Sequence, residues 1–111
     1  MKIAEFDNNL IIQKRSEIHF LPFSDILYIE RFGNSTIIHI NDEEIVIRIS
    51  LQKLIDFLPK FFLRTHKSYI INIKRVKQMK FSGGDSTTYE AFFNYDKSAL
   101  VTKDKISIIF E

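Results

Sequence analysis

Apolar and polar residues alternate along most of the chain with the two-residue period that is typical of β-strands. The clearest example is the segment 45–49, in which three isoleucines share one face. Turn residues such as Gly33-Asn34 separate the runs and predict antiparallel hairpins. The predicted strands cover residues 10–12, 18–21, 26–32, 36–40, 45–49, 61–65, 68–72, 76–81, 89–93 and 99–101. Further turns are expected at 22–25, 41–43, 83–85 and 94–96.

One segment follows a helical period instead. Ser50 is a good N-cap residue, and Pro59 stops a helix that begins after it. Between them, apolar residues at helical spacing form a single stripe of Leu51, Leu54, Ile55 and Leu58. We therefore predict a helix over 51–58, and we expect Thr102 to cap a second, shorter helix. Together these elements predict an all-β domain, mainly β with one or two short helices.

The size and composition of the chain indicate one globular domain over residues 1–111. Hydrophobic residues make up 45% of it, and only three glycines and two prolines are present, which argues against disorder. No cysteine is available for disulfides or thiolate chemistry. No apolar run approaches the ~18 residues of a membrane span, and the first residues lack the core of a signal peptide. We expect a cytoplasmic protein with no membrane partner.

The distribution of charge is more informative than the formal charge of +2. Between Arg64 and Lys80 there are six lysines or arginines and no acidic residue. Acids gather instead at 42–44 and near the N-terminus. A one-sided basic segment is typical of proteins that bind a polyanion, although a solvated lysine-rich face has the same composition. Both interpretations remain open on charge alone.

The segment 61–72 places a polar, partly cationic cluster (residues 64–68) between two apolar runs. This pattern predicts two strands that flank an exposed connection, the usual way in which a fold presents a binding surface. In order, the residues read Phe62-x-Arg64-x-His66-x-Ser68-Tyr69-x-x-Asn72.

That order closely resembles the central motif of the LytTR-type DNA-binding domain of bacterial transcription regulators. Three further segments resemble family motifs in the same order along the chain: Asp25-Ile26-Leu27-Tyr28-Ile29-Glu30, residues 33–40, and Ser50-Leu51-x-x-Leu54. The resemblance covers nearly the whole chain. It implies an elongated stack of small antiparallel sheets that binds double-stranded DNA with loops rather than with a recognition helix.

The resemblance also implies which loops read bases. They are the turn with Asn34 and Ser35, the loop with Lys67, and the segment from Lys103 to Lys105. The last differs from the family's V-S-R-like ending. In Val101-Thr102-Lys103 the cation is a lysine, which cannot donate two parallel hydrogen bonds as arginine can, and Asp104 adds a negative charge. The family further implies two copies on paired repeat sites, hence a dimer on DNA. We expect either the output part of a longer regulator that a receiver domain controls, or a stand-alone regulator controlled by a partner protein.

The candidate contacts divide by chemistry. Asn34 and Lys67 have side chains that can bridge base edges in a groove. Phosphate contacts are expected from Arg64, Lys67, Ser68, Lys74, Arg75, Lys77, Lys103 and Lys105. His66 belongs to the same loop.

Each of four candidates also has an interpretation without DNA. Asn34 suits a turn that needs positive φ. Ser68 can bond its own backbone. Arg64 can pair with Glu30 in the sheet. His66 can order its neighbours by hydrogen bonding.

No pattern in the chain indicates an enzyme, a cofactor or a metal. The three histidines lack ligand spacing, and the nucleophile-elbow and phosphate-loop motifs are absent. Two hypotheses about function follow. The first is sequence-specific binding of duplex DNA by the output domain of a transcription regulator in a two-component system. The alternative is an all-β protein-interaction module that has a basic face and no DNA specificity.

Overall fold

The computed structural model describes residues 1–82 and 87–110, which form eleven strands in three antiparallel sheets. The first sheet consists of β1 (Lys2–Phe6), β2 (Asn9–Lys14) and β3 (Glu17–Pro22). The central sheet has the order β6 (Glu43–Ile47), β5 (Ser35–Ile40), β4 (Ile26–Phe32), β8 (Tyr69–Asn72) and β7 (Phe62–His66). The third has the order β11 (Ser98–Thr102), β10 (Thr88–Phe92) and β9 (Gln78–Phe81).

The helical elements are all short. The α-helices are α1 (Leu51–Leu54) and α2 (Ile106–Ile109). Single 3₁₀ turns cover Phe23–Asp25 (η1), Ile55–Phe57 (η2), Ile73–Arg75 (η3) and Lys103–Lys105 (η4). Among residues 1–82 and 87–110, no helix is long and apolar enough to cross a membrane.

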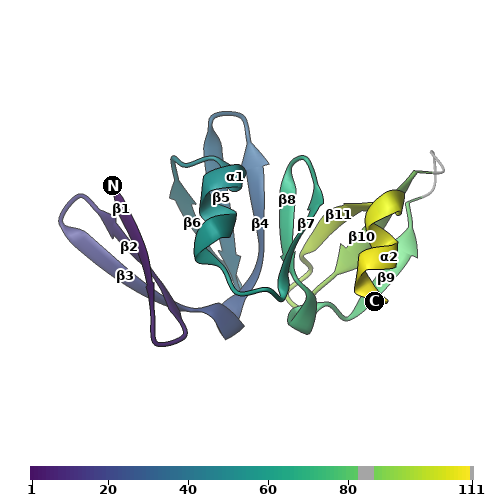
Figure 1. Ribbon diagram of the computed structural model, residues 1–111, viewed down its shortest axis with the longest axis horizontal. Coiled ribbons are helices and arrows are strands. Elements are labelled where there is room, and N and C mark those ends of the chain that lie inside the picture. Colours follow the sequence, from purple (N-terminus) through teal and green to yellow (C-terminus); the bar gives the residue numbers. More distant parts are fainter. Residues whose placement is uncertain (83–86, 111) are drawn as a thin grey trace.

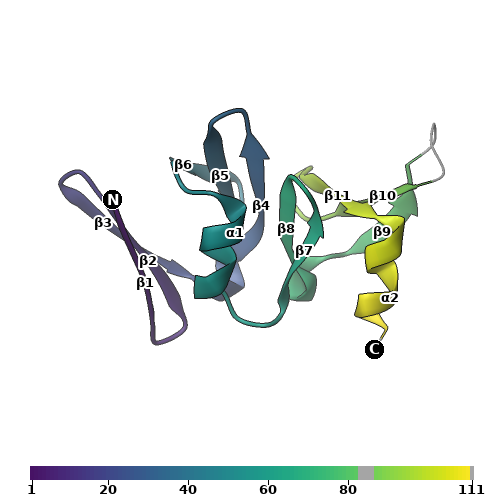
Figure 2. The same cartoon turned by 45° about the horizontal axis from the view of Figure 1, so that its top comes forward.

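The three sheets follow one another along the longest axis of a body that measures 45 × 29 × 25 Å (Figures 1 and 2). The predicted fold, an elongated stack of small antiparallel sheets, is therefore confirmed. Helix α1 lies beside the central sheet and α2 beside the third sheet (Figure 1).

The central sheet is buried on both faces, which explains the continuous apolar run in β4. Ile26 and Ile29 pack into a core shared with the first sheet and α1, whereas Leu27 and Tyr28 pack into a second core shared with the third sheet. A register shift between Ile26 and Tyr28 in the pairing with β5 accompanies this change of face. Strands buried on both faces are expected to lose the alternating pattern. The two cores therefore join the three sheets into one body.

The helix after Ser50 is shorter than predicted. Its N-cap is confirmed, because the Ser50 Oγ accepts a hydrogen bond from the Lys53 amide at 3.2 Å. However, the α-helix ends at Leu54 and the last turn tightens into η2, so the prediction of a helix over 51–58 was wrong at its C-terminal end. Leu58 is already extended, with φ −106° and ψ 146°. The ring of Pro59 disfavours the helical region for the residue before it, so the stop acts one residue early.

Two other predictions about elements need correction. Thr102 does not cap the C-terminal helix, because its hydroxyl donates to the Thr65 carbonyl oxygen at 3.2 Å and α2 begins through η4 instead. Strand β1 was not predicted, since only Ile3 of its five residues is sheltered from solvent and its backbone ladder with β2 provides most of its support. The expected turn at 83–85 lies outside the described residues.

Candidate nucleic-acid interface

Three connections lie side by side at one edge of the stack. The turn at residues 33–34 follows the C-terminal end of β4. The Arg31 amide donates to the Ser68 carbonyl oxygen at 2.8 Å, so the β7–β8 turn lies next to the β4–β5 turn. The Thr102–Thr65 hydrogen bond places the end of β11, and therefore η4, beyond the β7–β8 turn. We call the turns 33–34 and 67–68 together with η4 the loop edge; it forms the top of the molecule in Figure 1.

The β4–β5 turn exposes Asn34 without needing it for backbone conformation. Phe32 and Ser35 pair across the turn, and Gly33 has a φ of +59°, which matches the first central position of a type II′ turn. Positive φ in this turn thus falls on the glycine and not on Asn34. Asn34 is exposed and Ser35 is half-buried at the base of the turn. The Asn34 amide is therefore free to meet a ligand at the tip.

Arg64 fixes the shape of the β7–β8 turn. Its Nε donates to the His66 carbonyl oxygen at 3.0 Å, and one terminal nitrogen donates to the Lys67 carbonyl oxygen at 2.6 Å. The alternative pairing of Arg64 with Glu30 was wrong, since the Glu30 carboxylate binds His39 instead. A planar guanidinium can hold two carbonyls of one turn at the same time. Arg64 thus acts inside the turn and presents the exposed Lys67 outward.

His66 orders the same turn from the other side. Its Nδ1 accepts a hydrogen bond from the Ser68 amide at 3.0 Å, which agrees with the ordering role considered for it. Burial lowers the pKa of His66, and the neighbouring cations Lys67 and Arg64 lower it further. The neutral ring is the form that accepts this bond. His66 therefore supports the positions of Lys67 and Ser68 at neutral pH.

The third connection carries cations and an acid together. Lys103 and Asp104 are both exposed and line one hollow with Thr87 and Thr102, whereas Lys105 is half-buried. The Lys103 amide donates to the Thr87 carbonyl oxygen at 2.7 Å, which fixes η4 to the start of β10. Asp104 is therefore next to Lys103 at the loop edge, where it offsets part of the positive charge of Lys103 and Lys105.

The basic segment 64–80 does not form a single surface. The Arg75 guanidinium donates to the Ser24 carbonyl oxygen, and Ser24 precedes β4, at the end of that strand opposite Asn34. Strand β4 has seven residues, so its ends are roughly 20 Å apart. The Lys74 Nζ lies 4.2 Å from the centre of the Phe61 ring at the same end. The Lys77 amide donates to the Phe92 carbonyl oxygen near the β10–β11 turn. These three cations lie on the opposite edge from Asn34 and Lys67.

Comparison with known proteins identifies the family of this chain. A model described as the LytTr DNA-binding domain matches residues 16–111, which include all four sequence motifs. The chain belongs to the LytTR family. This is a family of DNA-binding domains, not a class of enzymes.

Curated relatives of this LytTR domain are longer proteins. The transcriptional regulatory protein NatR of Bacillus subtilis (strain 168) is 36% identical over 104 residues, which are 93% of this chain and 44% of NatR. The transcriptional regulatory protein LytR of Staphylococcus aureus (strain N315) is 29% identical over 100 residues, or 89% of this chain and 37% of LytR. The chain thus spans less than half the length of either relative.

A solved structure has the same fold. It is a LytTr DNA-binding domain from Bacillus cereus, which superposes with a TM-score of 0.75 at 21% identity and covers 94% of each chain. The stack of sheets in this LytTR domain is therefore the fold of that structure.

Arg31 is a structural residue of the site that the sequence did not reveal. One of its terminal nitrogens donates to the Thr36 hydroxyl and to the Ile49 carbonyl oxygen, both at 3.0 Å. These bonds brace the base of the β4–β5 turn against the chain that leads into α1. In sequence, Arg31 is merely a polar residue near a strand end, and no pattern distinguishes it.

Replacing Arg64 by lysine tests its role in the LytTR domain. Lysine keeps the charge but cannot hold two carbonyls in one plane, so we expect amide hydrogen exchange at 66–68 to accelerate and DNA affinity to fall by about tenfold. Exchange mass spectrometry and fluorescence anisotropy measure the two effects. If Arg64 were only a point charge for phosphate, Arg64→Lys would bind DNA nearly as well as the original chain and exchange would not change.

A buried polar cluster lies away from the loop edge and makes stability depend on pH. His39 is 4% exposed; its Nε2 is 2.7 Å from Glu30 Oε1, and its Nδ1 is 2.8 Å from the Lys97 Nζ. Glu44 Oε2 lies 3.6 Å from the same Nδ1. Burial lowers the pKa of His39, the hydrogen bond to Glu30 opposes that effect, and the Lys97 ammonium adds to it. Protonation of Nδ1 would place two cations in contact.

The free energy of unfolding is therefore expected to fall as the pH drops below about 6.5, the ordinary pKa of histidine. In that window the unfolded chain binds more protons than the folded one, so stability rises with pH. The lowered pKa of His66 acts with the same sign. Urea unfolding at several pH values measures the slope. His39→Gln should reduce it, whereas His19→Gln, which removes a surface histidine, serves as the control. A stability that rises on acidification would contradict this assignment.

Proposed function

We propose that this LytTR domain binds double-stranded DNA sequence-specifically through its loop edge, as the output domain of a transcription regulator in the cytoplasm. The observation that carries the proposal is the common placement of Asn34, Lys67 and η4 on one edge. Each connection is fixed by hydrogen bonds to a neighbouring element, so the exposed side chains are held before DNA arrives. Such pre-organisation reduces the entropy lost on binding.

The dimensions of the domain agree with contacts in two grooves. The sheets succeed one another along an axis of 45 Å, and one turn of B-DNA is about 34 Å long. The proposal places the β4–β5 turn and η4 in successive major grooves of a duplex that runs along the loop edge, with the β7–β8 turn between them. Asn34 and Lys67 would read base edges, and Ser35, Ser68, Lys103 and Lys105 would contact the backbone. Arg64 and His66 would shape the central turn.

Contact of DNA with Lys74, Arg75 and Lys77 stays a prediction. Those cations lie on the opposite edge, so a straight duplex on the loop edge would not reach them. We leave them out of the proposed interface. Paired repeat sites, a dimer on DNA, and control by a receiver domain or a regulatory partner belong to the same proposal, on the strength of the family membership.

Selection from a randomised duplex library at about physiological salt tests the function, followed by anisotropy of the enriched sites across a salt series. We expect enrichment of a paired repeat and an affinity that falls linearly with the logarithm of salt concentration. Salt-sensitive binding without enrichment would mean that phosphate contacts exist and base reading does not. No binding would favour the protein-interaction module with a basic face.

A further inference from the structure

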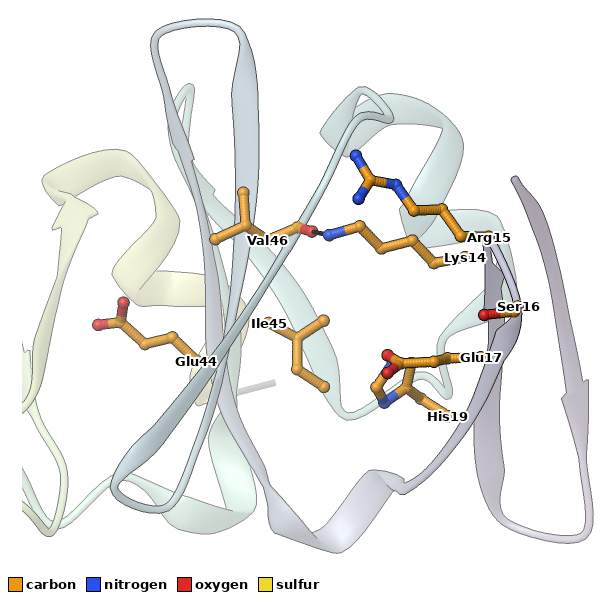
Figure 3. Close-up of a pocket in the computed structure, with 8 residues that line it drawn as sticks. All are labelled: Lys14, Arg15, Ser16, Glu17, His19, Glu44, Ile45 and Val46. Carbon is orange, nitrogen blue, oxygen red and sulfur yellow. Dashed lines mark hydrogen bonds and ion pairs between the residues drawn. The ribbon is translucent and has the colours of Figure 1, made fainter.

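The β2–β3 turn of the first sheet is a fourth connection on the side of the loop edge (Figure 1). The Lys14 Nζ donates to the Val46 carbonyl oxygen at 2.7 Å, which fixes the turn to the edge strand β6 of the central sheet. Arg15 occupies the turn itself, with a φ of +58°, and is exposed. Figure 3 shows the Arg15 guanidinium beside Lys14, on the side away from Glu17 and His19.

Two adjoining hollows connect this turn with the β4–β5 turn. Arg15 lines the first hollow together with Ser35 and Arg48. Arg48 also lines the second hollow, with Asn34 and Lys53. Arg48 therefore lies between the β2–β3 turn and the candidate base-reading residue Asn34.

These hollows are cationic, and three of their cations have no partner among the described residues. No acidic residue of the described chain lines either hollow. The side chains of Arg15, Arg48 and Lys53 form no hydrogen bond or ion pair with residues 1–82 or 87–110, and all three are exposed. The hollow on the other side of Lys14 differs, because Glu17 and Glu44 line it. Positive charge thus concentrates on the side that faces the β4–β5 turn.

We propose that Arg15, Arg48 and Lys53 form a phosphate-binding strip that holds the DNA backbone beside the β4–β5 turn and extends the footprint beyond the three connections of the loop edge. The inference rests on the proposed function. Arginine can donate two parallel hydrogen bonds to phosphate oxygens, and no acceptor within residues 1–82 or 87–110 is bonded to the Arg15 or Arg48 side chain. Lys14 is a positioning residue, since its ammonium is already bound to the Val46 carbonyl.

This strip cannot be recognised from the order of residues along the chain. Its members are far apart along the chain and come from a turn, the segment after β6, and α1. Stacking of the first sheet on the central sheet brings them together. Arg15 also precedes residues 16–111, the part that the family model matches, so the strip extends beyond the family's common core.

The test compares Arg15→Ala/Arg48→Ala with the control Lys60→Glu. Both variants lower the net charge by two, and Lys60 is exposed and lies outside the strip. The probe is the duplex enriched by selection, measured by anisotropy between about 50 and 200 mM salt. We expect the strip variant to bind roughly tenfold more weakly at the lower salt and its logarithmic salt slope to shrink by about 1.8, which is two phosphate contacts. The preferred sequence should not change, since backbone contacts carry no base information.

Shortening the duplex locates the contact. Removal of about five base pairs flanking the half-site should weaken binding of the original chain and have little further effect on the strip variant. Equal slopes for the strip variant and the control, or equal sensitivity of both to duplex length, would overturn the strip and leave the proposed function intact. Failure of the original chain to bind any duplex would overturn both.

Discussion

Replacement of Asn34 and Lys67 together by alanine is expected to remove most of the preference of the domain for its own site. Each side chain lies exposed at the tip of a turn, and a good bidentate contact with a base contributes about 1–3 kcal/mol of discrimination. Loss of both should cost about 2–6 kcal/mol, or from about thirtyfold to above ten-thousandfold in affinity for the enriched site. Anisotropy on the enriched duplex and on a scrambled duplex measures the change.

The same experiment distinguishes base reading from non-specific binding to DNA. Affinity for the scrambled duplex should fall far less, because non-specific binding depends on phosphate contacts. Thermal unfolding should be nearly unchanged, since neither side chain is buried. Asn94→Ala/Lys60→Ala changes the same two residue types at exposed positions away from the loop edge and is the matched control. If both double variants lost affinity equally, the loop edge would not be the reading surface.

Asn72→Ala is expected to cause the largest loss of stability. Asn72 is fully buried, and its amide nitrogen donates to the carbonyl oxygens of Ile26 at 2.9 Å and Phe23 at 3.3 Å. Its side-chain oxygen accepts from the Lys74 amide at 3.0 Å. One side chain thus joins η1, the start of β4 and η3. A buried polar group that loses its partner costs about 1–3 kcal/mol, so we expect a total near 3 kcal/mol.

Urea unfolding measures this loss, and the melting temperature should fall by more than about 10 °C. Asn72→Asp keeps the shape but cannot donate to the two carbonyls, so it should be no better than alanine. The exposed Asn94→Ala should stay within about 0.5 kcal/mol of the original chain. A small effect of Asn72→Ala would mean that water replaces the amide, and that the family motif retains this residue for another reason.

Local patterns in the sequence predicted local structure well. Gly33-Asn34 predicted a two-residue hairpin, which the pairing of Phe32 with Ser35 confirms. Ser50 predicted the start of α1 correctly, because a cap needs only residues three positions away. The end of the helix was missed since Pro59 acts through the conformation of Leu58.

The candidate site was predicted less completely, because neighbours in sequence and neighbours in space differ in a stack of sheets. Strand β8 carries the chain from Ser68 at the loop edge to Asn72 at the other end, so Lys74 and Arg75 follow on the opposite side. Conversely, Arg15 and Arg48 are remote in sequence and line the same hollow. Charge counted along the chain therefore overstated one basic surface and concealed another.

Different parts of the molecule determine the spacing of the DNA contacts and the choice of bases. The β4–β5 and β7–β8 turns belong to the central sheet, whereas η4 follows a strand of the third sheet. The distance from the two turns to η4 therefore depends on how the apolar core between these two sheets packs. The exposed tips, by contrast, take no part in that core. Substitutions at the tips can therefore alter which bases are preferred while the interval between contacts persists. Changes of side-chain volume in the core would instead alter the spacing between bases that the domain accepts within the operator. The hydrophobic interior thus determines the distances between contacts on a surface of which it is not a part.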